Sequence, residues 1–142
     1  MKHISSSEEE TTEFAQNFAR TLKRGDIVLM HGDLGAGKSV FCRAVIRAIC
    51  SQDALEVPSP TFTLVQTYDF QGGEIWHFDL YRLSDPSEIY ELGWEEAMSS
   101  EIVLIEWPSR LGNLKPRTHI DITLTHVNGS ENQRKIEVQK YE

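Results

Sequence analysis

The sequence predicts an α/β fold in a single domain over residues 1–142, with a central mixed, partly parallel sheet, flanking helices and a C-terminal β-hairpin. Two short, unbroken apolar runs are typical of strands buried on both faces. Segments with the apolar spacing of helices stand beside these runs, and two alternating stretches end the chain. A length of 142 residues gives room for one hydrophobic core and leaves none for a second substrate domain.

The first expected element is an amphipathic helix that begins near Ser7. Ser7 and Glu10 have the spacing of a capping box. Apolar residues then recur on one helix face at Phe14, Phe18 and Leu22. The apolar run 26–31 predicts the first buried strand. Residues 39–49 predict a second helix, with apolar side chains facing inward and arginines facing outward.

A glycine-rich loop connects this strand to the second helix. It consists of Gly32, Asp33, Leu34, Gly35, Ala36, Gly37, Lys38 and Ser39. Glycine leaves no Cβ between the backbone and an anion, so successive N–H groups and the helix N-terminus can surround a phosphate. Lys38 can reach the β- and γ-phosphate oxygens of a nucleotide, and the Ser39 hydroxyl can ligate Mg²⁺. A glycine-rich turn with an incidental lysine is the alternative, but the flanking strand and helix are the context that a P-loop requires.

The middle of the chain predicts a loop, two strands and a helix. Proline neither continues a helix nor fits a central strand, so Pro58–Pro60 indicates a shaped loop. Residues 61–70 and 74–80 are expected to be strands that flank a glycine turn. Asp85 followed by Pro86 marks the start of a helix that ends near Gly93.

The last third contains the second fully apolar strand and the hairpin. Residues 102–105 form the apolar run, which Glu106 ends. The alternating stretches 119–127 and 134–141 flank a loop with an Asn-Gly pair, which favours a β-hairpin.

Two carboxylates are expected at strand ends near the glycine loop, where ligands bind in open α/β sheets. Glu106 closes one strand and Asp79 ends another, and either can bind a metal or a water. Solvated carboxylates are the alternative for both. Thr61 follows the proline loop in the manner of a switch threonine that senses a γ-phosphate, or else it caps a turn. His31 and His77 fall within expected strands and are interpreted as core or supporting residues.

Composition restricts the possible partners. The net charge is −8, with 22 acidic against 14 basic residues, so the surface repels nucleic acid and any action on RNA is expected through a protein partner. No apolar run is long enough to span a membrane, and the polar N-terminus does not have the pattern of a signal peptide, so a cytoplasmic protein is expected.

Cys42 and Cys50 are expected to be reduced. No guanine-reading Asn-Lys-x-Asp segment is present, which favours adenine.

Five segments, in this order and spacing, resemble the TsaE (formerly YjeE) family, the small bacterial ATPases of tRNA threonylcarbamoyladenosine synthesis. They are Gly32–Ser39, Pro58–Val65, His77–Leu83, Glu91–Gly93 and Ile105–Pro108. The resemblance implies a P-loop NTPase fold, ATP with Mg²⁺, and a complex with TsaD and TsaB. In that family TsaD and TsaB transfer the threonylcarbamoyl group to adenosine 37 of tRNAs that read ANN codons, and TsaE hydrolyses ATP and resets the complex.

The resemblance also assigns roles to residues. It implies that Lys38 and Ser39 hold the phosphates and Mg²⁺, and that Asp79 and Glu106 organise metal and water. Thr61 would belong to a switch-like loop, and Trp107 would lie beside the site. Glu8 and Arg134 are the nearest matches to positions where the family's nucleotide touches the N-terminal segment and the last strand. Ser39 stands where threonine is commoner in the family, and it keeps the hydroxyl.

Three functions remain open from the residues. The first is a partner-dependent ATPase of the tRNA-modification complex. The second is a small-molecule kinase, because many kinases share the P-loop, although the chain is short for an acceptor site and a long lid. The third is a nucleotide-sensing interaction module in which hydrolysis is incidental.

Overall fold

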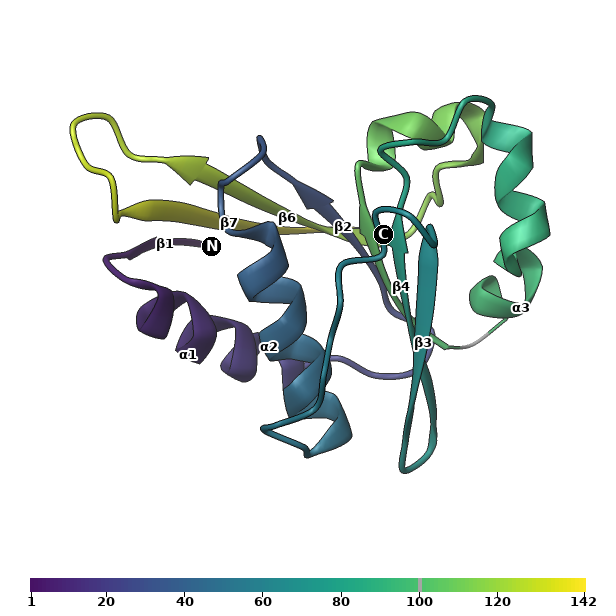
Figure 1. Ribbon diagram of the computed structural model, residues 1–142, viewed down its shortest axis with the longest axis horizontal. Coiled ribbons are helices and arrows are strands. Elements are labelled where there is room, and N and C mark those ends of the chain that lie inside the picture. Colours follow the sequence, from purple (N-terminus) through teal and green to yellow (C-terminus); the bar gives the residue numbers. More distant parts are fainter. Residues whose placement is uncertain (100) are drawn as a thin grey trace.

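A seven-stranded mixed sheet organises the molecule (Figure 1), and the computed structural model describes residues 1–99 and 101–142. The strand order is β1-β7-β6-β2-β5-β4-β3. The strands are β1 (Lys2–Ser5), β2 (Ile27–His31), β3 (Val65–Phe70), β4 (Gly73–Asp79), β5 (Ile102–Glu106), β6 (His119–His126) and β7 (Arg134–Tyr141). The predicted α/β class with a mixed sheet and a C-terminal hairpin is therefore confirmed.

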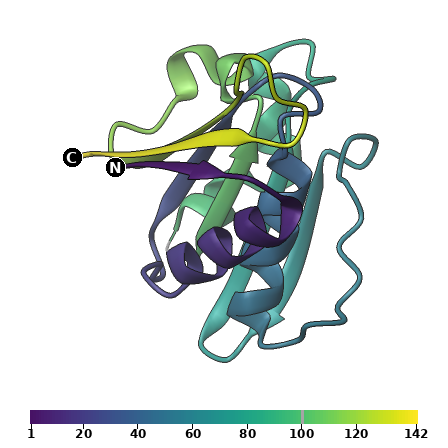
Figure 2. The ribbon, with the colours of Figure 1, turned by 90° about the vertical axis from the view of Figure 1, so that its left-hand side faces the viewer.

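The centre of the sheet is a parallel block of β6, β2, β5 and β4. Antiparallel strands extend it on both sides: β3 pairs with β4, and β7 and β1 follow β6. Because parallel strands run in one direction, their carboxyl ends meet at one edge of the sheet. The glycine loop leaves the end of β2 at this edge. The first and last strands, β1 and β7, lie side by side as the two outer strands on the side of the sheet away from β3 (Figure 2).

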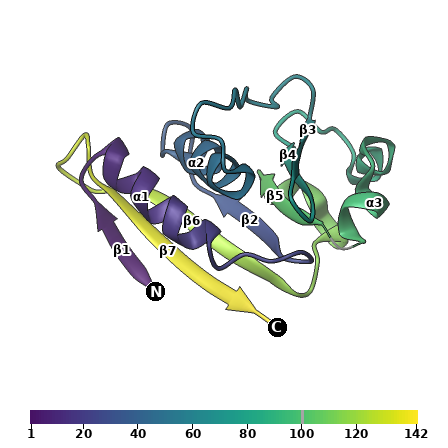
Figure 3. The same cartoon turned by 90° about the horizontal axis from the view of Figure 1, so that it is seen from below.

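Helices cover the two faces unequally. The α1 helix (Glu8–Ala19) and the α2 helix (Lys38–Cys50) pack together on one face (Figure 3), over a core that includes Val28 and Met30 of β2. On the other face, Leu29 belongs to a second core with residues of α3 (Trp94–Met98) and of two 3₁₀ helices, η1 (Pro86–Leu92) and η2 (Pro108–Leu114). This alternation along β2 is what the unbroken apolar run predicted.

Several elements differ from the sequence prediction. β1 was not expected, and residues 61–64 form turns before a strand that starts at Val65. The helix predicted to start at Asp85 and to end near Gly93 does form, and it is a 3₁₀ helix with a capping box between Asp85 and Glu88. The η2 helix after Pro108 was not expected either. The α1 helix ends at Ala19, one turn earlier than the apolar spacing suggested.

The start of α1 has the predicted cap at Ser7, but the return hydrogen bond of the capping box is shifted by one residue. The Ser7 hydroxyl accepts a hydrogen bond from the Glu10 N–H at 3.1 Å, as a helix cap does. The Glu10 carboxylate reaches back to the N–H of Ser6 at 2.9 Å rather than to that of Ser7. None of the helices in the described part of the chain is long and apolar enough to cross a membrane.

Candidate functional site

The glycine loop forms an open backbone cradle between β2 and α2. Gly35 and Gly37 have φ of +80° and +105°, and apart from their own chain neighbours no atom of the described residues lies within 4 Å of where a Cβ would stand. Gly32 is different: at φ +147° a Cβ would lie 2.6 Å from the carbonyl oxygen of Leu124 at the end of β6. Hence the first glycine is required by close packing, and the other two keep the mouth of the loop free of side chains.

Side chains of the loop divide between the core and the surface. Ala36 is buried, and its N–H donates to the Asp33 carbonyl at 3.1 Å, which tightens the turn. Asp33, Leu34 and Ser39 are exposed. The N-cap of α2 is Gly37, and no side chain of residues 1–99 and 101–142 forms a cap hydrogen bond there. The first-turn N–H groups of this helix are therefore available to an anion.

Lys38, the first residue of α2, turns back toward the strand ends. Its side chain is buried, and its ammonium donates to the Gly32 carbonyl and lies 3.7 Å from the centroid of the Trp107 ring. Burial lowers the pKa of Lys38, and the charges of Glu106 and Asp79 oppose this shift. A cation is thus held between the glycine loop and two carboxylates.

The two carboxylates lie where the sequence predicted them. Asp79 ends β4 and Glu106 ends β5, and the two residues are register partners in the parallel pair. Each is only 4% exposed, so the alternative of a freely solvated carboxylate is wrong for both. The carboxylate of Asp79 accepts hydrogen bonds from the Thr61 hydroxyl at 3.2 Å and from the Tyr81 N–H at 3.0 Å. The structure therefore joins the Thr61 loop to the strand ends.

Sequence reasoning did not identify the contact that holds Glu106. The His77 Nε2 atom lies 2.7 Å from Glu106 Oε2, and both side chains are buried. Lys38, His77, Asp79 and Glu106 together form what we call the strand-end cluster. Trp107, the residue after Glu106, has a left-handed backbone with φ +58°, and its ring packs against that of Tyr81 in a tilted arrangement with centroids 4.9 Å apart. The contact between His77 and Glu106 becomes apparent only when β4 and β5 are known to be neighbours. The alternation of side chains along β4 does place His77 and Asp79 on one face.

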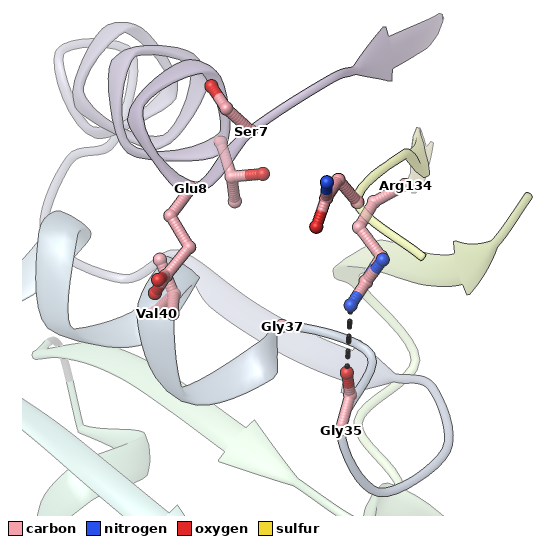
Figure 4. A pocket seen from close by; sticks show the side chains of 8 residues that line it. Ser7, Glu8, Gly35, Gly37, Val40 and Arg134 are labelled. Carbon is pink, nitrogen blue, oxygen red and sulfur yellow. Dashed lines mark hydrogen bonds between the residues drawn. The ribbon is translucent and has the colours of Figure 1, made fainter. Parts of the chain in front are cut away.

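A pocket of about 260 Å³ opens on the other side of the loop (Figure 4). Its lining includes Glu8 at the start of α1 and Arg134 at the start of β7, the two positions suggested from the terminal segments. The Arg134 guanidinium points at the loop and donates to the Gly35 carbonyl at 3.4 Å. Gly35 and Gly37 of the predicted loop also line the pocket, whereas sequence reasoning did not place Ser7, Thr11, Val40 and Asn132 there. We call this cavity the hairpin pocket.

The donor set fits a triphosphate and a hard divalent cation. The cradle offers backbone N–H groups without side-chain competitors, and Lys38 adds one positive charge beside it. The Ser39 hydroxyl and the carboxylates of Asp79 and Glu106 supply oxygen ligands, which are the ligands that Mg²⁺ prefers. Such a set can bind a phosphate chain and direct a water toward it.

Comparison with known proteins points to one family. The family model described as "Threonylcarbamoyl adenosine biosynthesis protein TsaE" matches residues 5–136. A tRNA threonylcarbamoyladenosine biosynthesis protein TsaE from Rickettsia bellii is 50% identical over 85% of this chain and 83% of its own length. Its counterpart from Aquifex aeolicus is 35% identical over 96% of this chain and 94% of its own.

The fold has a solved relative as well. The crystal structure of YdiB from Bacillus subtilis superposes with a TM-score of 0.75 over 99% of this chain and 84% of that chain, at 23% sequence identity. At that identity the likeness supports the fold alone. The family model and the two relatives carry the assignment: this chain belongs to the TsaE family.

Proposed function

We propose that this chain is the ATP-binding and ATP-hydrolysing subunit of tRNA threonylcarbamoyladenosine synthesis, acting with TsaD and TsaB homologues. In this role it supports threonylcarbamoylation of adenosine 37 in tRNAs that read ANN codons and resets the complex between turnovers. The observation that carries the proposal is the strand-end cluster, in which Lys38 and two buried carboxylates stand beside an open glycine cradle.

Phosphate binding begins with the backbone. The N–H groups of the loop and of the first turn of α2 take up the phosphate oxygens, because no side chain caps them. Lys38 leaves the Gly32 carbonyl and the Trp107 ring for the β- and γ-phosphates. Since burial disfavours its charge, a phosphate partner is a better environment for the ammonium than a carbonyl.

Hydrolysis uses the two strand ends. A bound Mg²⁺, held by Ser39 and by the carboxylates of Asp79 and Glu106, would neutralise charge on the β- and γ-phosphates. The carboxylates also orient the attacking water, whose oxygen bonds to the γ-phosphorus as the bond to the β–γ bridging oxygen breaks. Thr61 donates to Asp79 and so couples its loop to the occupancy of the site. The products are ADP and phosphate.

The rest of the nucleotide extends toward the hairpin pocket. Gly35 and Gly37 belong both to the loop and to the lining of this pocket, so a ligand held by the loop reaches it directly. Glu8 offers an acceptor to ribose or base donors, and Arg134 offers a planar cation that can stack on a base or pair with a phosphate. The proposed base is adenine.

Partners supply what the chain does not offer. Its net charge of −8 disfavours direct binding of tRNA, so tRNA is reached through TsaD and TsaB in the cytoplasm. Exposed apolar side chains stand near the site, including Leu34 on the glycine loop and Phe62 beside Thr61, which are 70% and 82% exposed. Both suit contact with a protein partner.

The test measures free phosphate from ATP with the chain alone, with TsaD and TsaB, and with each partner singly. The proposal expects Mg²⁺-dependent phosphate release that rises when both partners are present. Formation of a phosphorylated metabolite would support a kinase instead. Nucleotide-dependent complex formation without hydrolysis would support an interaction module.

A further inference from the structure

His77, the buried histidine of the strand-end cluster, contacts one of the two carboxylates. The His77 side chain is 3% exposed and that of Glu106 is 5% exposed, and a distance of 2.7 Å joins His77 Nε2 to Glu106 Oε2. His77 pairs in register with Leu104, so it stands one row below the Asp79–Glu106 pair and on the same face of the sheet. Long side chains reach such diagonal neighbours across two strands.

The two ring nitrogens of His77 have different surroundings. Nε2 faces the carboxylate, whereas Nδ1 is buried and has no hydrogen-bond partner among the described residues. A carboxylate oxygen can only accept, so Nε2 carries the proton. The geometry therefore assigns Nε2 as the donor in this hydrogen bond.

This bond restricts how the Glu106 carboxylate can turn. Oε2 is fixed by His77, and no hydrogen bond within residues 1–99 and 101–142 engages Oε1. The end of the Glu106 side chain is thereby held before any ligand arrives. Cys42 on α2 packs against this pair, since its sulfur lies within 4.8 Å of ligand atoms of both His77 and Glu106.

We propose that His77 is a positioning residue for Glu106: its Nε2–H holds Oε2 so that Oε1 stays available to the nucleotide side of the site. This inference rests on the proposed ATPase function. The effect falls on turnover rather than on nucleotide affinity, because His77 does not line the hairpin pocket and forms no hydrogen bond to the glycine loop within the described part of the chain. Preorganisation of a carboxylate by a supporting hydrogen bond is a recognised source of such an effect.

Two amide substitutions separate positioning from packing. In His77→Gln the side-chain amide nitrogen reaches about as far as Nε2, whereas in His77→Asn it reaches only as far as Nδ1. With TsaD and TsaB present, we expect His77→Gln to keep kcat within about threefold of the unmodified chain. We expect His77→Asn to lower kcat about tenfold or more, the value of a hydrogen bond to a charged group. KM for ATP and the dissociation constant of ADP should stay within about twofold in both.

The matched control is His119→Asn. His119 is also a buried strand histidine, but it lies at the start of β6, at the edge of the sheet opposite the glycine loop. The kcat of the His119→Asn variant should equal that of the unmodified chain. If both His77 variants lose kcat and ADP affinity together, or if His77→Asn turns over at the unmodified rate, His77 does not position Glu106.

A second measurement needs no activity. Nitrogen-15 NMR of the isolated chain should show a proton on Nε2 of His77, and Glu106→Ala should shift the Nε2 signal. A His77 proton on Nδ1 alone would overturn the inference. If the unmodified chain releases no phosphate with its partners, the proposed function fails, while the NMR result still decides whether His77 holds Glu106.

Discussion

The strand-end cluster and the hairpin pocket lie on either side of one glycine loop, yet they are built differently. Lys38, His77, Asp79 and Glu106 are each 6% exposed or less, and three of them stand on adjacent parallel strands in fixed register. Around the hairpin pocket, Glu8 is exposed, and Arg134 contacts the loop through one hydrogen bond of 3.4 Å.

This difference separates two tasks. Groups that act on a transferring phosphate must be held to a fraction of an ångström, which adjacent backbone strands provide. Groups that orient the rest of a nucleotide can adjust to it, and a helix start beside a hairpin is sufficient. Substitutions should therefore be severe in the cluster and mild in the pocket.

The largest effect is expected from Glu106→Gln. The amide keeps the shape and an acceptor for His77 but removes the charge that serves metal and water. We expect kcat to fall about 100-fold or more, with ADP affinity within about threefold. The matched control is Glu101→Gln, because Glu101 precedes the other end of β5. A Glu106→Gln variant with unaltered phosphate release would mean that the cluster does not perform the chemistry.

Lys38→Ala should come next. It removes the buried ammonium beside the cradle while the loop N–H groups remain, so nucleotide affinity should fall about 10- to 100-fold. Isothermal titration with ADP measures this, and Lys23→Ala provides an exposed lysine as control. Affinity that survives Lys38→Ala would place the phosphates outside the loop.

A smaller effect is expected in the hairpin pocket. Arg134→Ala should weaken ATP binding about three- to tenfold with kcat nearly unchanged, because the arginine only orients the ligand. Lys135→Ala is the control, since Lys135 pairs with Glu137 at 3.1 Å on the same strand. If Arg134→Ala reduces kcat as strongly as Glu106→Gln does, the contrast between the two regions is wrong.

The smallest expected signal is binding of tRNA by the isolated chain. With a net charge of −8 no retardation should appear in a gel-shift experiment at physiological salt. Addition of TsaD and TsaB should bring the chain into a tRNA-containing complex. Tight binding by the chain alone would show that a surface of this molecule reads RNA directly.

Elements with strong local patterns were predictable from the sequence. The apolar runs of β2 and β5, the glycine loop and the alternating hairpin all appear where expected. β1 was missed because its four residues carry no apolar pattern of their own, and they form a strand only by pairing with β7. The cap at Asp85 predicted a helix start correctly, but a cap does not distinguish an α-helix from a 3₁₀ helix.

For the site, too, the positions of residues along the chain were predictable, whereas contacts between different strands were not. Strand ends located Asp79 and Glu106, because the carboxyl ends of parallel strands meet at one edge. The contact of His77 with Glu106 depends on β4 and β5 being neighbours in register, which local sequence does not specify. The position of Lys38 over Trp107 depends on a left-handed backbone at a non-glycine residue, which few sequence signals would indicate.

The pairing of β1 with β7 implies that the glycine loop and the hairpin pocket form at different stages of folding. Ser5 pairs with Arg134 at the end of this ladder, and its hydroxyl lies 2.7 Å from that of Thr11 in α1. Closing contacts so distant along the chain is slow, whereas β2, the loop and α2 are contiguous. The cradle for phosphate can therefore assemble early during folding, and the pocket wall at Glu8 and Arg134 forms late. An edge strand of four residues is also among the first to open, so amide exchange should be fastest there.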